Sequence, residues 1–280
     1  MSAGVVVVIG VGGMGLAIAR RQGVGNKVLL ADFNELTLSS AANELRRQGH
    51  DVTEQTVDVS QRASVAALAD EAARLGAVTQ VVHTAGLSPA QASAAAVLAV
   101  DLLGTALVLE EFARVITPGG AGVAISSMAG HMPTVRLSAE QQQALAHTPA
   151  DELLDLPFTN PEELGKGAYP LAKYGNRLRV QAASAQWGER GARINSISPG
   201  VIATPMGQQE LDSESGQVMR AMVAASGTGR LGTPDDIAAA AAFLLGPDAT
   251  FITGNDLLVD GGVIAAIRTG RLTPVGPRAR

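Results

Sequence analysis

Apolar and polar positions along the chain follow two patterns that take turns. Short runs rich in valine, isoleucine, leucine and threonine are followed by longer segments whose apolar residues lie three or four positions apart. The short runs predict strands and the longer segments predict amphipathic helices. We expect strands at residues 5–9, 27–31, 51–57, 78–84, 122–125, 193–197 and 256–259. Strands that alternate with helices are typical of an α/β domain with a parallel sheet covered on both faces.

The helical segments are expected at residues 34–48, from about 61 onward, and at 90–115, 168–187, 211–225 and 235–245. In the first of them, Leu36, Ala41, Ala42 and Leu45 are assigned to one apolar face. No long polar linker interrupts the order of elements, and 280 residues suit one or two domains. We therefore predict a single domain over residues 1–280.

Residues 131–166 break the alternation, because they contain no convincing strand pattern. The segment 148–151, Thr-Pro-Ala-Asp, predicts the start of a helix, with a capping residue, a proline and an early acid. We interpret 131–166 as an insertion. The C-terminal tail, about residues 263–280, offers little core and carries four arginines, Arg268, Arg271, Arg278 and Arg280.

A glycine-rich turn follows the first strand. Gly10, Gly12 and Gly15 spell G-x-G-x-x-G in front of an apolar-periodic helix. Glycines let the backbone turn sharply and approach a pyrophosphate, and the start of the helix supplies free N–H groups and a positive dipole. Asp32 ends the second strand, where a carboxylate that binds the hydroxyls of an adenosine ribose is expected. The unit predicts a dinucleotide site; the alternative is an incidental strand, turn and helix.

Composition narrows the class of partner. The formal net charge is −5 and no basic stripe occurs, which argues against nucleic acid and favours a small metabolite. The absence of cysteine excludes disulfides, thiolate catalysis and cysteine-ligated zinc. The apolar N-terminus has no basic flank and is too short for a signal sequence or a membrane span, so we expect a cytoplasmic protein without membrane contact.

Asp58 follows the third strand and allows two compatible interpretations. Its side chain is expected near the position of an adenine, or it caps the helix that begins near Gln61.

Tyr169 and Lys173 lie four positions apart, so a helix places them on the same face. They follow a strand that ends in Ser126-Ser127 and precede the segment 195–200, Asn-Ser-Ile-Ser-Pro-Gly. In this order, the features resemble the short-chain dehydrogenase/reductase family over nearly the whole chain. Further matches are Asp58-Val59, Thr84-Ala85-Gly86, and the segments 231–238, 252–254 and 260–262.

The resemblance implies a doubly wound Rossmann fold with a seven-stranded parallel sheet and NAD(H) across the carboxyl ends of the strands. It also implies hydride transfer between nicotinamide and a secondary alcohol or ketone. Ser127 is expected to hold the substrate oxygen, Tyr169 to act as acid and base, and Lys173 to bind the nicotinamide ribose. Cofactor contacts are implied for Gly10, Gly12, Gly13, Met14, Gly15, Asp32, Phe33, Asp58, Val59, Thr84, Ala85, Gly86, Tyr169, Lys173, Pro199, Gly200, Val201, Ile202 and Thr204.

Elementary chemistry supports the pairing of Tyr169 with Lys173. A tyrosine with a pKa of about 10 is a poor base at neutral pH. A neighbouring cation favours the tyrosinate.

The chain departs from the family pattern at three places. The glycine turn is one residue short and has Ile9 in place of threonine, and Thr84 stands where asparagine is usual. Asp101 stands where the family has the asparagine that supports a water relay to the lysine; an ionised aspartate accepts hydrogen bonds but donates none. We include Asp101 among the catalytic candidates. The alternative is an aspartate in a helix that faces solvent.

Two other functions remain open. The apolar residues at 153–154 and 156–158 are compatible with a hydroxysteroid-type dehydrogenase, and the altered glycine turn with a non-catalytic dinucleotide sensor; the retained Ser127, Tyr169 and Lys173 argue against the sensor. His83, His131 and His147 lack the spacing of metal ligands, so no metal is expected. Of the three, only His131 is expected to face substrate.

Ser127 and Tyr169 lie 42 positions apart, a much longer gap than is usual in the family. Long ordered insertions in compact domains tend to be functional. The insertion is expected to cover the substrate pocket together with residues 205–229, or to cover the helix that begins at Ala168, where many family members pair subunits. We expect a homo-oligomer, either a dimer or a tetramer.

Overall fold

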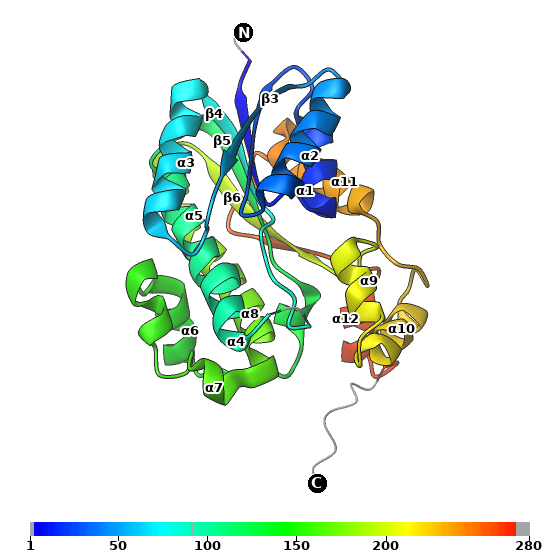
Figure 1. Ribbon diagram of the computed structural model, residues 1–280. Coiled ribbons are helices and arrows are strands. Elements are labelled where there is room, and N and C mark those ends of the chain that lie inside the picture. Colours follow the sequence, from blue (N-terminus) through cyan, green and yellow to red (C-terminus); the bar gives the residue numbers. More distant parts are fainter. Residues whose placement is uncertain (1–2, 91, 273–280) are drawn as a thin grey trace.

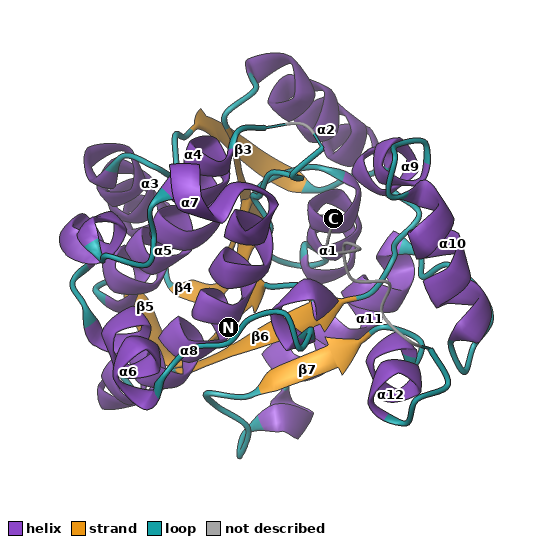
Figure 2. Ribbon diagram, turned by 90° about the horizontal axis from the view of Figure 1, so that it is seen from below, coloured by secondary structure: helices purple, strands orange, loops and turns teal. Residues whose placement is uncertain are grey.

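The computed structural model describes residues 3–90 and 92–272 of the chain. One parallel sheet has the order β3-β2-β1-β4-β5-β6-β7, with helices on both faces (Figures 1 and 2). This is the predicted doubly wound seven-stranded fold. The strands are β1 (Val5–Ile9), β2 (Lys27–Asp32), β3 (Asp51–Thr56), β4 (Val78–His83), β5 (Ile116–Ile125), β6 (Arg193–Pro199) and β7 (Asp256–Val259).

The valine run of β1 shows why the sheet is covered twice. Val5, Val7 and Ile9 pack into one apolar cluster with α3 (Arg62–Leu75), α5 (Gly104–Ala113) and α8 (Ala168–Glu189). Val6 and Val8 pack into a second cluster with α1 (Gly13–Gln22), α2 (Glu35–Arg47) and α11 (Pro234–Leu245). Successive side chains of a strand point to opposite faces, so a continuous apolar run requires a helix layer on each side.

In α2, one predicted core residue is wrong. Leu36 is 84% exposed, and Leu38 is buried in its place with Ala41, Ala42 and Leu45. The buried positions follow helical spacing, and Leu36 lies two positions before the first of them, on the opposite side of the helix.

The helix expected over 90–115 is broken. It consists of α4 (Ala94–Val97), a π-helical segment (Leu98–Leu103) and α5. The Thr105 hydroxyl donates to the Asp101 carbonyl oxygen at 2.8 Å. A side chain that binds the carbonyl four residues earlier perturbs the helical ladder, and π segments are frequent at functional sites.

The C-terminal part also differs from expectation. The helix expected over 211–225 is two helices, α9 (Pro205–Leu211) and α10 (Gly216–Ala225). The tail forms α12 (Val263–Arg268), which buries Val263 and Ile264 in a small cluster with Val201 and Leu211, contrary to the prediction of little core. Arg278 and Arg280 lie outside the described residues.

The insertion contains α6 (Ala139–His147), a 3₁₀ helix (Ala150–Asp155) and α7 (Pro161–Leu164). The helix start predicted at 148–151 is present as a 3₁₀ helix with acids in its first turn, but Thr148 is the C-cap of α6 and does not cap it. Leu145 and Leu153 are fully buried in the same cluster as α5 and α8. Most of the insertion therefore lies against the helix layer of the sheet.

The buried Arg179 of α8 fastens the insertion. Its guanidinium donates to the carbonyl oxygens of Leu145 and Thr148, and to Glu110 of α5 at 3.0 Å. Glu110 also accepts from the Ala150 N–H at 3.2 Å. One side chain thus supplies hydrogen bonds to carbonyl oxygens at the end of α6 and forms an ion pair between α8 and α5.

Candidate active site

The glycine turn packs tightly against the end of β4. Gly10 has φ +90°, and a Cβ on it would lie 2.4 Å from the Ala85 nitrogen; a Cβ on Gly15 would lie 1.9 Å from the Gly10 carbonyl oxygen. Only glycine fits at these two positions. The Thr84 hydroxyl donates to the Gly10 carbonyl oxygen at 2.6 Å, which gives Thr84 a role in holding the shortened turn.

A cleft of about 790 Å³ opens at the carboxyl ends of the strands. It collects most of the predicted cofactor residues from separate loops: Gly10, Gly12, Gly13, Met14, Gly15, Asp32, Phe33, Asp58, Val59, Thr84, Ala85, Gly86 and Thr204. It also contains residues that the sequence analysis missed: Thr37, Val57, Ser60, Leu87, Ala96, Ala99, Val100, Pro205 and Met206. Ala96, Ala99 and Val100 follow helical spacing before Asp101, a signal that could have identified them.

The shape and chemistry of the cleft fit a dinucleotide. The helix α1 begins at Gly13 behind the glycine turn, with Gly12 as an N-cap that makes no side-chain hydrogen bond. Unpaired N–H groups at a helix start, beside a turn in which Gly10 and Gly15 leave no room for a Cβ, suit a pyrophosphate.

Two backbone amides fix the carboxylate of Asp32. Val11 N–H donates to one oxygen at 2.8 Å and Asn34 N–H to the other at 2.9 Å. Each oxygen keeps a lone pair that can accept a ribose hydroxyl. Among the described residues that line the cleft there is no lysine or arginine. Arg20, on α1, instead contacts Glu44 at 2.6 Å.

Asp58 lines the cleft but does not cap a helix. Its carboxylate accepts from the N–H of Ser60 at 3.0 Å and from the Ser60 hydroxyl at 2.7 Å. The N-cap of α3 is Gln61, and no side chain bonds there. The capping interpretation of Asp58 is therefore wrong, since the carboxylate closes a turn before the helix begins.

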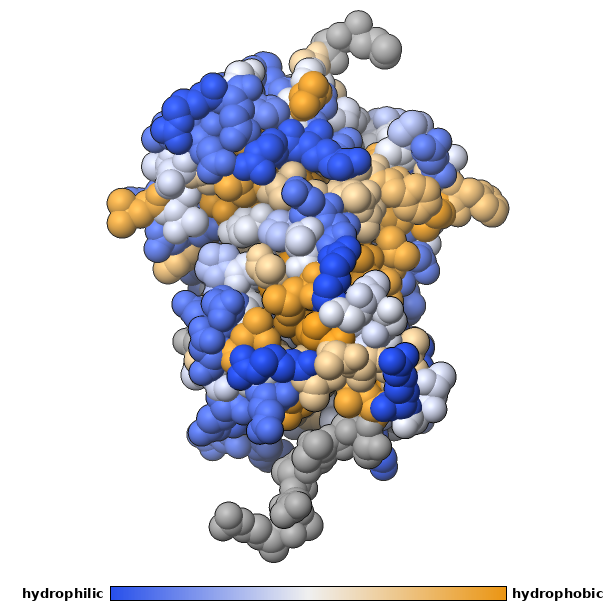
Figure 3. All heavy atoms as spheres, turned by 90° about the vertical axis from the view of Figure 1, so that its right-hand side faces the viewer, coloured by the Kyte–Doolittle hydropathy of each residue, from blue (hydrophilic) through white to orange (hydrophobic). Residues whose placement is uncertain are grey.

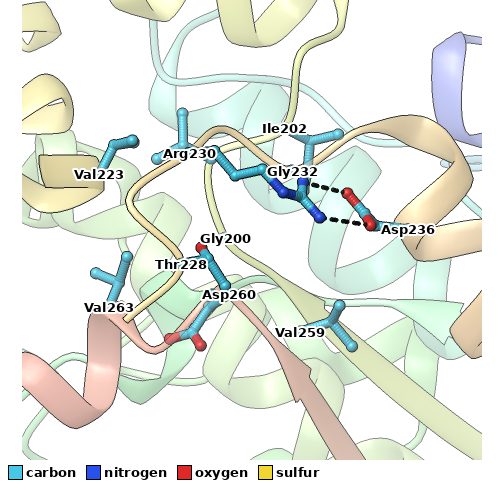
Figure 4. A pocket seen from close by; sticks show the side chains of 12 residues that line it. Gly200, Ile202, Val223, Thr228, Arg230, Gly232, Asp236, Val259, Asp260 and Val263 are labelled. Carbon is cyan, nitrogen blue, oxygen red and sulfur yellow. Dashed lines mark hydrogen bonds and ion pairs between the residues drawn. The ribbon is translucent and has the colours of Figure 1, made fainter. Parts of the chain in front are cut away.

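Six of the implied cofactor residues are outside the described lining of this cleft: Tyr169 and Lys173, which belong to the catalytic group, and the four residues of the segment 199–202. Gly200, Val201 and Ile202 line a separate cavity of about 150 Å³, beside the Arg230–Asp236 ion pair (Figure 4). Pro199, which ends β6, is absent from the described lining of the large cleft. Backbone hydrogen bonds from Gly200 to Val259 and from Gly232 to Val201 hold the chain along β7 until Thr204 reaches the cleft.

The catalytic candidates meet beside this cleft. The first turns of α8 place the Lys173 Nζ 5.5 Å from the centre of the Tyr169 ring. The Ser127 hydroxyl lies near the Tyr169 phenol and acts to lower its pKa. Asp101 Oδ2 lies 3.2 Å from Lys173 Nζ, and Asp101 Oδ1 accepts from the Leu87 N–H at 2.7 Å. Asp101 is 0% exposed, so the interpretation as a solvent-facing residue is wrong.

The charges of this group act on one another. Burial raises the pKa of Tyr169; Lys173 and the Ser127 hydroxyl oppose the rise, and Asp101 adds to it. Lys173 thus favours the tyrosinate as expected, but the net pKa is raised. Burial also raises the pKa of Asp101 against the attraction of Lys173. Burial acts to lower the pKa of Lys173, and the charges of Asp101 and Tyr169 outweigh it.

Two contacts near the site were not predicted. The buried Ser88 hydroxyl donates to Glu210 of α9 at 2.6 Å, and the Glu210 charge contributes to the raised pKa of Tyr169. The His131 Nε2 lies 2.7 Å from Asp256 Oδ2, so this ring nitrogen faces β7 and not the substrate side. Neither pair is close in sequence, and no local pattern signals it.

A second cavity, of about 250 Å³, lies next to Tyr169. Its other walls are Pro89 and Ala92 of the loop before α4, Ala94 and Val97 of α4, Gly165 and Lys166 at the end of the insertion, and Ala168, the first residue of α8. The insertion therefore contributes its last residues to this cavity. Within residues 3–90 and 92–272, no helix is both long and apolar enough to cross a membrane.

The sequence was compared with family models and curated proteins. The model described as "short chain dehydrogenase" matches residues 4–139, and the one described as "Enoyl-(Acyl carrier protein) reductase" matches residues 162–264. Short-chain dehydrogenase/reductase bsc3 of Alternaria brassicicola is 42% identical over 95% of this chain and 97% of its own length. D-threitol dehydrogenase of Mycolicibacterium smegmatis is 32% identical over 89% of this chain and 88% of its own.

Solved structures share the fold. Levodione reductase superposes with a TM-score of 0.77 at 24% identity, over 94% of this chain and 98% of that one. An actinorhodin polyketide ketoreductase solved with NADPH gives a TM-score of 0.72 at 24% identity, over 93% and 97% of the two chains. With the matching sheet and the sequence relatives, these comparisons show that the chain is an oxidoreductase of the short-chain dehydrogenase/reductase family.

Proposed function

We propose that the protein is an NAD(H)-dependent oxidoreductase that transfers hydride between nicotinamide and a secondary alcohol or ketone. The observation that carries this proposal is the meeting of Ser127, Tyr169 and Lys173 beside the glycine-turn cleft. Bound NAD(H) would supply or accept the hydride.

Three side chains would bind the substrate oxygen and transfer the proton. The Ser127 hydroxyl and the Tyr169 phenol hold the substrate oxygen between them, which orients its carbon toward the cleft. Tyr169 gives its proton to a carbonyl oxygen in reduction and takes one from a hydroxyl in oxidation. Lys173 stabilises the tyrosinate that reduction leaves behind. The raised pKa of Tyr169 keeps the phenol protonated at neutral pH, the state that a reductase needs.

The preference for NAD over NADP rests on Asp32. Its fixed carboxylate lies in the cleft where no lysine or arginine is among the described lining residues. A 2′-phosphate would place like charges together, at a cost that can reach several kcal/mol.

A compact substrate suits the cavity beside Tyr169 better than a steroid. The walls are alanine, proline and valine, and the volume is about 250 Å³. Leu153, one of the insertion residues that suggested a hydroxysteroid, is buried in the core and does not line this cavity. The threitol and galactitol dehydrogenases among the relatives support small alcohols as the substrate class.

A panel of secondary alcohols, polyols and ketones, followed by NADH absorbance, tests the proposal. We expect turnover with at least one compact alcohol or ketone, and a higher kcat/KM with NAD(H) than with NADP(H). Turnover only with NADP(H) would contradict the role of Asp32.

We also propose a homo-oligomer. Phe243, near the C-terminal end of α11, is 45% exposed, and Phe251, six positions beyond the end of that helix, is fully exposed. Figure 3 shows apolar side chains gathered in the middle of the face that includes α11, α9 and α10. A Phe251→Ser variant with a lower mass by light scattering supports a second copy of the chain as the partner; an unchanged mass argues against this surface.

A further inference from the structure

Asp256 lies on β7 with its side chain only 6% exposed, and three hydrogen-bonding side chains and one guanidinium converge on it. His131 Nε2 is 2.7 Å from Oδ2, and the Ser196 hydroxyl donates to Oδ1 at 2.6 Å. The Ser198 hydroxyl lies 2.9 Å from both oxygens, and Arg177 Nε lies 3.4 Å from Oδ2. A buried carboxylate is costly unless such donors satisfy it.

The donors come from three elements that surround the catalytic residues. Ser196 and Ser198 belong to β6, and Arg177 lies on α8, one turn beyond Lys173. His131 is the last residue of a 3₁₀ helix (Met128–His131) whose N-cap is Ser127. The Asp256 carboxylate is the point where this short helix, α8 and the sheet are joined.

Further contacts fix the same short helix on α8. The Ser126 hydroxyl donates to the Lys173 carbonyl oxygen at 2.6 Å, and the Arg177 guanidinium donates to the Gly130 carbonyl oxygen at 2.8 Å. A four-residue 3₁₀ helix has little stability of its own, so its position depends on such contacts. The position of Ser127 relative to Tyr169 depends on it in turn.

The carboxylate is held in its ionised form. Burial acts to raise the pKa of Asp256, but the hydrogen bonds from His131 and Ser196 and the charge of Arg177 outweigh it and lower the pKa. An ionised carboxylate only accepts, so the His131 Nε2 must carry the proton and donate. In the hydrogen bond between the two side chains, His131 therefore donates and Asp256 accepts. An asparagine amide at position 256 would disturb this arrangement.

We propose that Asp256 is a positioning residue for catalysis, which acts through His131 to hold the Ser127 hydroxyl against the Tyr169 phenol. The inference rests on the proposed function of that site. It predicts that the effect of Asp256 on turnover passes through Ser127, whereas a purely structural role would act regardless of Ser127.

The test is a double-mutant cycle on kcat, with the substrate found in the alcohol and ketone panel. Asp256→Asn keeps the shape but replaces one acceptor by a donor that faces donors. We expect kcat to fall on the order of tenfold or more, since small misplacements of a catalytic group have effects of this size. The KM for NAD(H) should stay within about twofold. In a Ser127→Ala background, the same change should lower kcat by less than about twofold.

Glu111→Gln is the matched control, because Glu111 is a buried carboxylate of α5 whose described ion pairs are with Arg62 and Arg114, away from the 3₁₀ helix. Glu111→Gln should change kcat by the same factor in the parent background and in the Ser127→Ala background. An equal loss for Asp256→Asn in both backgrounds, or no loss in either, overturns the proposal.

A pair of His131 variants decides the matter if Asp256→Asn does not fold or if Ser127→Ala leaves no measurable turnover. His131→Gln keeps a donor near Asp256 and should retain most of kcat, whereas His131→Leu should lose it. Equal kcat values for the two would contradict the proposal. Failure of the hydride-transfer function itself is separable, because the parent protein would then turn over no compound of the panel, whatever Asp256 does.

Discussion

The Lys173 ammonium lies 3.2 Å from the Asp101 carboxylate, and both side chains are buried. Each charge changes the other: Asp101 contributes to the raised pKa of Lys173, and Lys173 opposes the rise in the pKa of Asp101. The pair lies beside Tyr169, whose pKa Lys173 lowers and Asp101 raises. Asp101 therefore weakens the effect that Lys173 has on the phenol.

Asp101→Asn should shift the pH dependence of alcohol oxidation toward lower pH. The change removes a negative charge that raises the pKa of Tyr169 and leaves the Lys173 charge uncompensated, so the tyrosinate forms at lower pH. The Leu87 N–H can still donate to the amide oxygen, which preserves the local fold. The pH profile of kcat is the measurement. An unchanged profile, or a shift to higher pH, would place Asp101 outside the proton path.

His83 should make the fold less stable in mild acid. Burial, with the nearby Lys173 charge, lowers its pKa to about 3, and neither ring nitrogen has a hydrogen-bond partner among the described residues. In the unfolded chain the pKa is about 6.5, so the unfolded state gains a proton first as the pH falls. The stability associated with neutral His83 is complete above about pH 6.5 and is lost toward pH 3.

The measurement is the free energy of unfolding of the parent and of His83→Leu at pH 7 and pH 5. At about 1.4 kcal/mol per pH unit, the parent should lose roughly 2 kcal/mol more than the variant. Equal losses would mean that His83 is not buried in its neutral form.

Arg179→Met should loosen the insertion. The change leaves the carbonyls of Leu145 and Thr148 without this donor, and a buried acceptor left unsatisfied costs about 1–3 kcal/mol. Glu110 keeps the Ala150 N–H and Arg62 as partners. Limited proteolysis should cleave residues 139–164 faster than in the parent. Arg114→Met is the control, because Arg114 is 48% exposed and its ion pairs contribute about 1 kcal/mol or less. Parent-like cleavage and melting of Arg179→Met would show that apolar packing alone holds the insertion.

Asp32→Asn should reduce the preference for NAD over NADP. The amide oxygen can keep one hydrogen bond, with Val11 or Asn34, while the negative charge is removed. We expect the ratio of kcat/KM values for the two cofactors to fall on the order of tenfold or more, as the repulsion of a 2′-phosphate disappears. Asp51→Asn, at the exposed start of β3, should leave the ratio unchanged. If the Asp32 variant also leaves it unchanged, another residue selects the cofactor.

Sequence patterns predicted those features that depend on interactions between residues close together in the chain. The β-branched run of β1, the glycine turn before α1, and the spacing of Tyr169 and Lys173 each determine their structure within a few residues. The seven strands follow from such patterns, and the doubly wound arrangement follows from the family resemblance.

Features that depend on distant contacts were missed. The periodicity of apolar residues could not decide whether the Asp101 side chain is buried or exposed to solvent, since the π-helical segment that buries it depends on packing. The hydrogen bonds that hold the segment after β6 to Val259 and Gly232 are also not visible in sequence, and the cofactor contacts implied for Pro199, Gly200, Val201 and Ile202 stay a prediction. The contact of His131 with Asp256 joins residues 125 positions apart.

The most direct test of the account is the turnover of Tyr169→Phe with the best substrate from the panel, alongside NADH binding measured by fluorescence. The ring and its packing remain while the hydroxyl that moves the proton is removed. We predict nearly unchanged NADH affinity and a loss of kcat of about 10²–10⁴-fold or more, the size typical of lost acid–base catalysis. Turnover at the parent rate would contradict the central claim that Tyr169 transfers the proton.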